Sequence, residues 1–416
     1  MSGRVYIIGG GLSGLSAALC LVRRGVIPIV CEAGGQAGGR CRSYRDPVLR
    51  RALNNGSHLV LGANREVFSY LRLCGAEHTL RAVPQKGIPF YDLTDDCQWT
   101  LRVGLGAALA WPFDRRRIPG VGLGAILGDL YRLRRATGTV SQALGDVDGP
   151  LFRRFWLPLC VAILNTHPDR AAAALLWAVL ERTLLKGSGA SRLFLPVRGL
   201  SETFVDPALV AIRRLRGEVR LHTRLRAVSH GPTGLESLKF RRGAVRLDVQ
   251  DRVIFALPPY AVKHLVVGID APEGDRAIVN VHFDTPAYGG EAHVCAIVGG
   301  MGEWVFSQGD TTSVTLSDAD ARIGMEDSDL AGRVWTNVAR AQNISGSMGR
   351  YRIVREKRAT FLQSPQNERR RPGVTTPLGN LFLAGDWTNT GLPATIEGAL
   401  LSGRWAAEAV LRSFER

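Results

Sequence analysis

The sequence lacks paired cysteines and long apolar runs. Its seven cysteines are scattered and form no C-x-x-C pair, which argues against a disulfide framework or a metal site and favours a reducing, cytoplasmic compartment. The apolar runs Phe155–Leu164 and Ala171–Leu180 are too short to cross a bilayer. No basic stretch followed by an apolar core begins the sequence, so we expect no signal peptide.

Lysine is scarce as well: it supplies five of the 53 basic residues, although the formal net charge is +16. This arginine excess is compatible with genomic base composition alone, with an anionic membrane surface or with nucleic acid. No aromatic-interleaved basic strand, zinc finger or helix-turn-helix pattern is present, so we expect no nucleic acid partner. The length of 416 residues and an apolar content of 45% predict a globular enzyme of two domains.

The first forty residues contain the strongest motif. A strand pattern ends at Gly9, an apolar helical run extends to Arg24, and a second strand ends at Glu32. Gly9, Gly11 and Gly14 have the G-x-G-x-x-G spacing, which provides a tight turn, room for a pyrophosphate and close helix–strand packing. Glu32 is placed to accept hydrogen bonds from ribose hydroxyls. An ordinary βαβ turn is the alternative. The predicted cofactor contacts are Gly9, Gly11, Leu12, Ser13, Gly14, Glu32 and Ala33.

A second glycine pair, Gly38-Gly39-Arg40, follows five residues after Glu32. A solvated loop would also contain such residues. The pair with its arginine resembles the extended motif of FAD-binding flavoproteins of the amine oxidase and phytoene desaturase superfamily. The resemblance implies that Gly38, Gly39 and Arg40 lie at the cofactor, with the arginine near the FAD phosphates.

The segment Asn54-Asn-Gly-Ser-His58 places a glycine between small polar residues, which suits the approach of backbone to a flat ring. We therefore expect Gly56, Ser57 and His58 to contact the flavin. His58 is also our tentative catalytic residue, although a lone histidine is by default structural.

Strand and helix patterns alternate through the rest of the chain. We expect helices at 64–74, 149–187, 200–214, 330–341 and 394–414. Strands at 218–221, 225–228 and 244–249 suggest a meander, and those at 277–283, 293–298, 304–307 and 313–316 a second sheet. Further strands are expected at 88–93, 98–103, 253–257, 351–361 and 380–384.

The strand near the C-terminus closes on Gly385-Asp386 before the last helix. The superfamily resemblance implies that Gly385 and Asp386 lie by the phosphate and ribityl chain. It also implies that Thr395, Ile396 and Glu397 begin a helix aimed at the flavin pyrimidine end, which gains negative charge on reduction. Leu225 is the matching position on the adenine side.

Three stretches resemble one family within this superfamily: Phe155–Thr166, Arg355–Phe361 and Ala384–Ala399. That family is hydroxysqualene dehydroxylase, also called the squalene-associated FAD-dependent desaturase. The resemblance implies reductive removal of an allylic hydroxyl from a long isoprenoid, giving squalene for hopanoid synthesis, with hydride from reduced flavin. The family usually has Asp-Asn-Gly-Gln-His where this chain has Asn54-Asn-Gly-Ser-His58, and we expect the two changed side chains to face the flavin.

Alternative functions stay open. An amine oxidase is disfavoured, because the position of its aromatic cage residue is occupied by Thr395. A carotenoid desaturase or isomerase is closer, and a non-catalytic flavin-binding partner of a lipid-synthesis complex is a further hypothesis. The reductive reaction needs an electron donor, which no motif identifies.

We predict an α/β fold of the glutathione-reductase type. A discontinuous Rossmann FAD-binding domain comprises 1–64, 211–259 and 351–416, and an interleaved α+β substrate domain comprises 65–210 and 260–350. FAD is the only cofactor expected.

The segment Gly104–Ala136 has two small apolar runs, Gly104–Phe113 and Val121–Tyr131, separated by Arg115-Arg116-Arg117 and followed by further arginines. It is typical of a helix lying on anionic lipid, or of a buried helix pair with a solvated basic turn. The first alternative predicts a peripheral protein on the inner face of the cell membrane.

Overall fold

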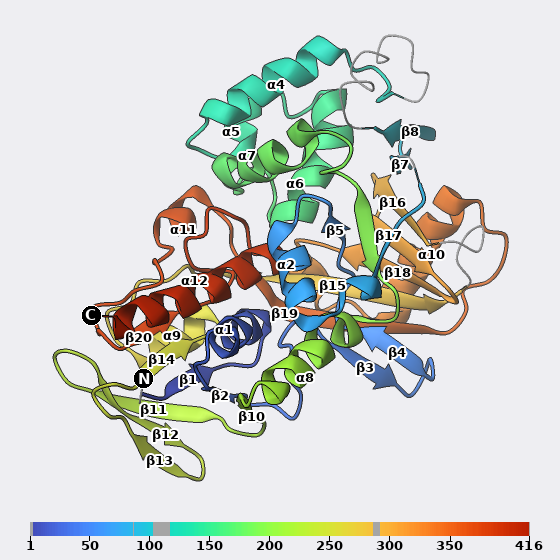
Figure 1. Cartoon of the computed structure of the whole chain (residues 1–416). Helices are drawn as coiled ribbons and strands as arrows, with labels where there is room; N and C mark the ends of the chain where they lie inside the picture. Colours follow the sequence, from blue (N-terminus) through green and yellow to red (C-terminus); the bar gives the residue numbers. More distant parts are fainter. Residues whose placement is uncertain (1–2, 86, 103–116, 286–291, 416) are drawn as a thin grey trace.

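The structure is a computed structural model that describes residues 3–85, 87–102, 117–285 and 292–415 (Figure 1). One of its two large sheets is parallel and five-stranded, in the order β10-β2-β1-β14-β20. Its strands are β10 (Glu218–Arg220), β2 (Pro28–Cys31), β1 (Val5–Ile8), β14 (Arg252–Phe255) and β20 (Leu381–Leu383).

Side chains alternate between the two faces of this parallel sheet, as they must in a strand. Val5 and Ile7 belong to a core shared with helices, whereas Tyr6 and Ile8 belong to a core on the opposite face. The helices of the first core are α1 (Leu12–Arg23), α2 (Arg65–Cys74), α8 (Asp206–Arg214) and α12 (Ile396–Phe414). The opposite face is covered by β11 (Leu225–His230), β12 (Leu235–Phe240), β13 (Gly243–Arg246) and α9 (Pro259–Leu265).

The meander differs from our prediction. Strands β11, β12 and β13 form it, whereas β10 pairs in parallel with β2 as an edge of the Rossmann sheet. The prediction was wrong for β10 because a strand that follows a helix can return to the parallel sheet through a crossover. Helix α8 ends at Arg214, four residues before β10 begins.

The second sheet has seven strands in the order β19-β15-β18-β17-β16-β7-β8, antiparallel except for the pair β16–β7. The strands of the predicted second sheet at 277–316 are all confirmed. The strands are β19 (Tyr351–Phe361), β15 (Asp275–Asp284), β18 (Thr311–Leu316), β17 (Trp304–Gln308), β16 (His293–Val298), β7 (Ile88–Asp92) and β8 (Cys97–Leu101).

Helices cover both faces of the seven-stranded sheet. On one face Val305 and Leu316 share a core with α10 (Asp327–Gln342). On the other face Phe90 and Trp304 share a core with a helical group. That group comprises α4 (Leu123–Arg135), α5 (Val140–Leu144), η2 (Phe152–Trp156), α6 (Leu157–Leu164) and α7 (Ala173–Arg182).

Smaller elements connect the two sheets. They are β3 (Ser43–Asp46) paired with β4 (Arg51–Asn54), a sheet of β5 (Val60–Leu61), β9 (Leu193–Pro196) and β6 (Leu80–Ala82), and α11 (Pro365–Arg369). Single helical turns are η1 (Glu77–Thr79), η3 (Leu184–Lys186), η4 (Ser201–Val205) and η6 (Asp320–Arg322).

The limits of the two domains stay a prediction. Two packing relations bear on them: α2 shares the core of α1, and β19, which we assigned to the FAD-binding domain, pairs with β15.

Candidate flavin site

The three glycines of the first motif have three different environments. A Cβ atom on Gly9, which has φ of +111°, would lie 2.2 Å from the Ala256 oxygen, and one on Gly14 would lie 2.0 Å from the Gly9 oxygen. A Cβ on Gly11 would meet no atom within 4 Å. Helix α1 begins directly after Gly11 without a side-chain cap. The open side of Gly11 therefore fits a phosphate at a helix N-terminus.

Glu32 lies beside this turn. Its Oε2 accepts a hydrogen bond from the Gly10 N–H at 2.8 Å, and its Oε1 accepts one from the Gly34 N–H at 2.7 Å. Each carboxylate oxygen has a second lone pair, so the group can still accept ribose hydroxyls. The Thr223 N–H donates to the backbone carbonyl oxygen of Glu32 at 2.7 Å, which brings the start of β11, with Leu225, towards the same strand end.

Arg40 joins the two halves of the predicted cofactor motif. The Gly38 N–H donates to the Gly10 oxygen at 2.8 Å, which places the second glycine turn on the first. The Arg40 guanidinium lies 2.7 Å from the Asp386 carboxylate and also donates to the Ala359 oxygen. The arginine side chain remains 43% exposed. A cation held at the junction of the N- and C-terminal motifs suits a diphosphate.

The turn that contains Asp386 is braced from within. The Ser402 hydroxyl accepts from the Gly385 N–H at 2.9 Å. Arg371, whose side chain is fully buried, donates to the backbone carbonyl oxygens of Thr388 at 3.1 Å and Asp386 at 3.3 Å. Sequence reasoning did not identify Ser402 or Arg371, because neither lies in a recognisable motif.

Helix α12 begins at Ile396, where we expected the last helix to start. Thr395 caps the helix by accepting from the Gly398 N–H at 3.2 Å. The Glu397 carboxylate instead accepts from the backbone N–H groups of Glu66 and Val67, each at 3.0 Å, and burial raises its pKa. The Glu397 carboxylate therefore caps α2, and the contact of Thr395, Ile396 and Glu397 with a flavin stays a prediction.

The Asn54 side chain is hydrogen-bonded within the protein, and its place at the flavin stays a prediction. Its Oδ1 accepts from the Leu200 N–H at 3.0 Å and the Ser43 hydroxyl at 2.8 Å. Both partners are donors, so an aspartate would make the same two bonds. The difference from the family pattern at this position therefore leaves the local hydrogen bonding intact.

The next residues of this segment contact the seven-stranded sheet, most of whose strands fall in the predicted substrate domain and which we call the substrate sheet. Asn55 is buried, and its side chain donates to the Arg40 oxygen and to Glu356, each at 3.2 Å. The Ser57 N–H donates to the Asn280 carboxamide at 3.4 Å. Asn280, on β15, was not singled out in the sequence.

His58 is a poor acid in this environment. Burial, with a smaller contribution from the positive charge of Arg40, lowers the pKa of the imidazole to about 4. The ring is therefore neutral at pH 7, and a neutral imidazole donates a proton weakly. This property counts against His58 as the proton donor, and its catalytic role stays a prediction.

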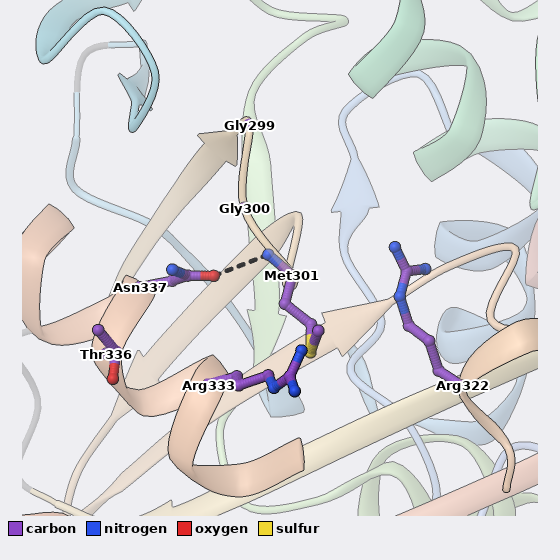
Figure 2. A pocket seen from close by; sticks show the side chains of 7 residues that line it. All are labelled: Gly299, Gly300, Met301, Arg322, Arg333, Thr336 and Asn337. Carbon is purple, nitrogen blue, oxygen red and sulfur yellow. Dashed lines mark hydrogen bonds between the residues drawn. The ribbon is translucent and has the colours of Figure 1, made fainter. Parts of the chain in front are cut away.

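A cavity of about 400 Å³ lies elsewhere, between β16, β17 and α10 (Figure 2). Its lining residues include Arg322, Arg333 and Asn337, and the Asn337 Oδ1 accepts from the Met301 N–H at 2.7 Å. Nearby, burial raises the pKa of Glu303 to about 7. Helix α10 covers the sheet face opposite to that of Asn280, so this cavity is separate from the flavin residues.

Known proteins are similar to this chain in sequence and in fold. Residues 12–411 match the family described as flavin containing amine oxidoreductase. The hydroxysqualene dehydroxylase of Rhodopseudomonas palustris is 38% identical over 99% of each chain. A 15-cis-phytoene desaturase of Narcissus pseudonarcissus is 24% identical over 99% of this chain and 80% of its own.

Among solved structures, the cyclohexylamine oxidase of Brevibacterium oxydans superimposes over the full length of both chains with a TM-score of 0.73 at 15% identity, which supports the fold alone. The glycine turns, Glu32 and the Arg40–Asp386 pair fit FAD, the cofactor of this superfamily. From its full-length similarity to curated members, the chain belongs to the hydroxysqualene dehydroxylase family of FAD-dependent oxidoreductases.

Proposed function

We propose that the protein reductively dehydroxylates hydroxysqualene to squalene, as a step of hopanoid biosynthesis. The observation that supports this most strongly is the 38% identity to a hydroxysqualene dehydroxylase over 99% of both chains. The hydroxyl of such an isoprenoid is allylic, so its protonation and departure as water leave a delocalised cation. FAD, when bound and reduced, supplies the hydride that completes the replacement of hydroxyl by hydrogen.

The face of the substrate sheet that carries Asn280 also carries a cluster of buried aromatic side chains. Asn280, Thr315, Trp304, Ala296 and Phe90 pair across five adjacent strands and so point to the same side. Phe90 stacks on Trp99 with ring centroids 5.3 Å apart and meets Trp304 edge to face at 6.0 Å.

These three aromatic side chains lie on the face that contacts the 54–58 segment through Asn280. Aromatic faces attract cations in a dry environment, and an apolar surface excludes water that would trap the cation. The three rings are at most 7% exposed and lie in the core between the sheet and the helices, so they would stabilise the cation of a substrate that enters this core.

The experiment that tests this proposal is anaerobic turnover of hydroxysqualene by the dithionite-reduced holoprotein. Phytoene serves as the substrate of the alternative desaturase, with the oxidised holoprotein. A protein that binds FAD but converts neither isoprenoid would be the non-catalytic flavin-binding partner. Hydrogen peroxide formed from benzylamine or a polyamine would support an amine oxidase instead.

We also propose that α4 rests on an anionic membrane surface at the cytoplasmic face. No helix in the described part of the chain is long and apolar enough to span a bilayer. Leu127 and Tyr131, one helical turn apart on α4, are 57% and 62% exposed. Arg134 and Arg135 follow on the next turn and are exposed. An exposed apolar stripe beside arginines suits the lipid headgroup region.

The first run of the predicted interfacial segment, with Arg115 and Arg116, lies outside the described residues. The proposal therefore rests on α4, whose inner side is anchored in the core: Leu133 is buried, and the Asp129 carboxylate accepts from the Trp156 Nε1–H at 2.5 Å.

Liposome co-sedimentation tests the docking proposal, with Arg134→Gln/Arg135→Gln compared with a charge-matched control, Arg224→Gln/Arg226→Gln. The control residues are exposed on or next to β11, at the bottom of Figure 1, whereas α4 lies at the top. The double variant Arg134→Gln/Arg135→Gln should bind anionic vesicles about 2 kcal/mol more weakly than wild type, because each basic residue near the surface contributes about 1 kcal/mol. Equal loss in both double variants would indicate attraction by net charge alone and contradict docking through α4.

A further inference from the structure

Asn280 is one of two residues described above, with Glu356, through which the substrate sheet bonds to the 54–58 segment. It lies on β15, and 1% of it is exposed. Its Oδ1 accepts from the Thr315 hydroxyl at 2.8 Å and from the Ser57 N–H at 3.4 Å. Its Nδ2 donates to the backbone carbonyl oxygen of Asn55 at 3.5 Å. One carboxamide thus bonds to the backbone on both sides of Gly56.

Ser57 and Asn55 together fix which way this carboxamide points. The Ser57 N–H can only donate and the Asn55 backbone oxygen can only accept, so they require the oxygen of Asn280 on the Ser57 side and its NH₂ group on the Asn55 side. A flipped amide would place its NH₂ group against the Ser57 N–H and its oxygen against the Asn55 oxygen. Both contacts are unfavourable in a buried position. The backbone of the segment and the Asn280 amide therefore fit each other in one orientation, and the Thr315 hydroxyl adds a further hydrogen bond to the Asn280 oxygen.

There is little free space beside the segment at this point. A Cβ on Gly56 would lie 3.3 Å from the Asn280 Nδ2, so the backbone passes close to the amide. The Asn55 side chain, on the other side, is bonded to the Arg40 oxygen and to Glu356. Hydrogen bonds therefore connect the glycine–arginine turn, the 54–58 segment and strands β15 and β18 of the substrate sheet.

We propose that Asn280 is a positioning residue: it holds the Asn55–Ser57 backbone where the flavin ring binds, and Thr315 supports it through a hydrogen bond to its oxygen. The proposal rests on contact between this segment and FAD. It does not depend on which isoprenoid is the substrate.

Holoprotein variants test this inference through FAD affinity, the flavin absorption spectrum and the flavin midpoint potential. Asn280→Ala removes the hydrogen bonds, so we expect roughly three- to ten-fold weaker FAD binding. Asn280→Asp puts a carboxylate against the Asn55 oxygen and adds a negative charge, so we expect a midpoint potential more negative than that of wild type. Thr315→Val removes one hydrogen bond to the Asn280 oxygen, so we expect a loss of FAD affinity in the same direction as that of Asn280→Ala but smaller, with a measurable change in the flavin spectrum.

The control is Thr312→Val. Thr312 is buried on the same strand, but its hydroxyl lies 3.1 Å from the Ser307 hydroxyl and not at Asn280. This variant should keep the wild-type spectrum and potential. If Asn280→Ala fails to fold, Asn280→Asp and Thr315→Val decide the question.

Wild-type affinity, spectrum and potential in every folded Asn280 and Thr315 variant would overturn the inference. Failure of the dehydroxylase proposal would be recognised separately: the wild-type holoprotein would form no squalene, while the Asn280 variants would still change the FAD affinity or the flavin potential.

Discussion

The guanidinium of Arg40 lies 2.7 Å from the carboxylate of Asp386, although 346 residues separate them in the sequence. The N-terminal glycine motif and the C-terminal Gly-Asp motif are thereby brought to a single place. Arg40 keeps 43% of its side chain exposed while Asp386 is 8% exposed, so the arginine can meet a ligand without releasing the aspartate.

Replacing Arg40 with alanine should weaken FAD binding by roughly 1.5–3 kcal/mol, the contribution of charge-assisted hydrogen bonds. The matched control is Arg72→Ala, which breaks an exposed pair with Glu77 and should leave the affinity unchanged. Titration of the apoproteins with FAD measures both. Equal affinities of the Arg40 variant and wild type would refute a role for Arg40 at the phosphates.

Gly11→Ala and Gly14→Ala should fail in different ways. The Gly11 variant should fold with a near wild-type melting temperature and bind FAD poorly, because its Cβ enters the space predicted for the pyrophosphate. The Gly14 variant should lose stability, because its Cβ would lie 2.0 Å from the Gly9 oxygen. Thermal melts of the apoproteins and FAD titration separate the two effects. Tight FAD binding by the Gly11 variant would contradict the assigned phosphate position.

Asn54→Asp, which restores the pattern usual in the family, should leave FAD affinity within about three-fold of wild type. The reason is that Leu200 and Ser43 both donate to Asn54 Oδ1, a role that a carboxylate fills as well. A large gain in affinity or in turnover would show that this side chain acts on the flavin or the substrate after all.

His282 should make stability depend on pH. Burial lowers the pKa of this ring to about 4 from 6.5, and its Nδ1 lies 2.7 Å from the Ser313 hydroxyl. The unfolded chain binds the proton more tightly, so stability is lost as the pH falls from about 6.5 towards 4. Between pH 7 and pH 5 this group should cost about 2 kcal/mol. His282→Phe should remove that part of the slope in urea unfolding; an unchanged slope would contradict it.

The parts of the fold predicted well are those with strong local patterns. The strand, glycine turn and helix around Gly11 and the strand closing on Asp386 follow from short motifs. Asn280 and Arg371 could not be predicted in the same way. Each is an ordinary polar residue in its own stretch, and it acquires its role only from partners elsewhere in the fold, such as Ser57 and Thr388.

Glu397 illustrates a second limit of sequence reasoning. Its position at the start of α12 is predictable from the motif, but the direction of its side chain depends on where α2 packs. Similarly, β10 has the pattern of any short strand, and only the crossover through α8 decides that it joins the parallel sheet.

The central claim is the reductive dehydroxylation, and product analysis tests it most directly. The purified holoprotein is reduced anaerobically with dithionite and incubated with hydroxysqualene, and the extract is analysed by mass spectrometry, with unreduced and FAD-free protein as controls. We predict squalene in the reduced sample alone, with deuterium incorporated when the reduction is carried out in heavy water. Recovery of unchanged hydroxysqualene from a fully reduced, FAD-loaded protein would contradict the proposed function.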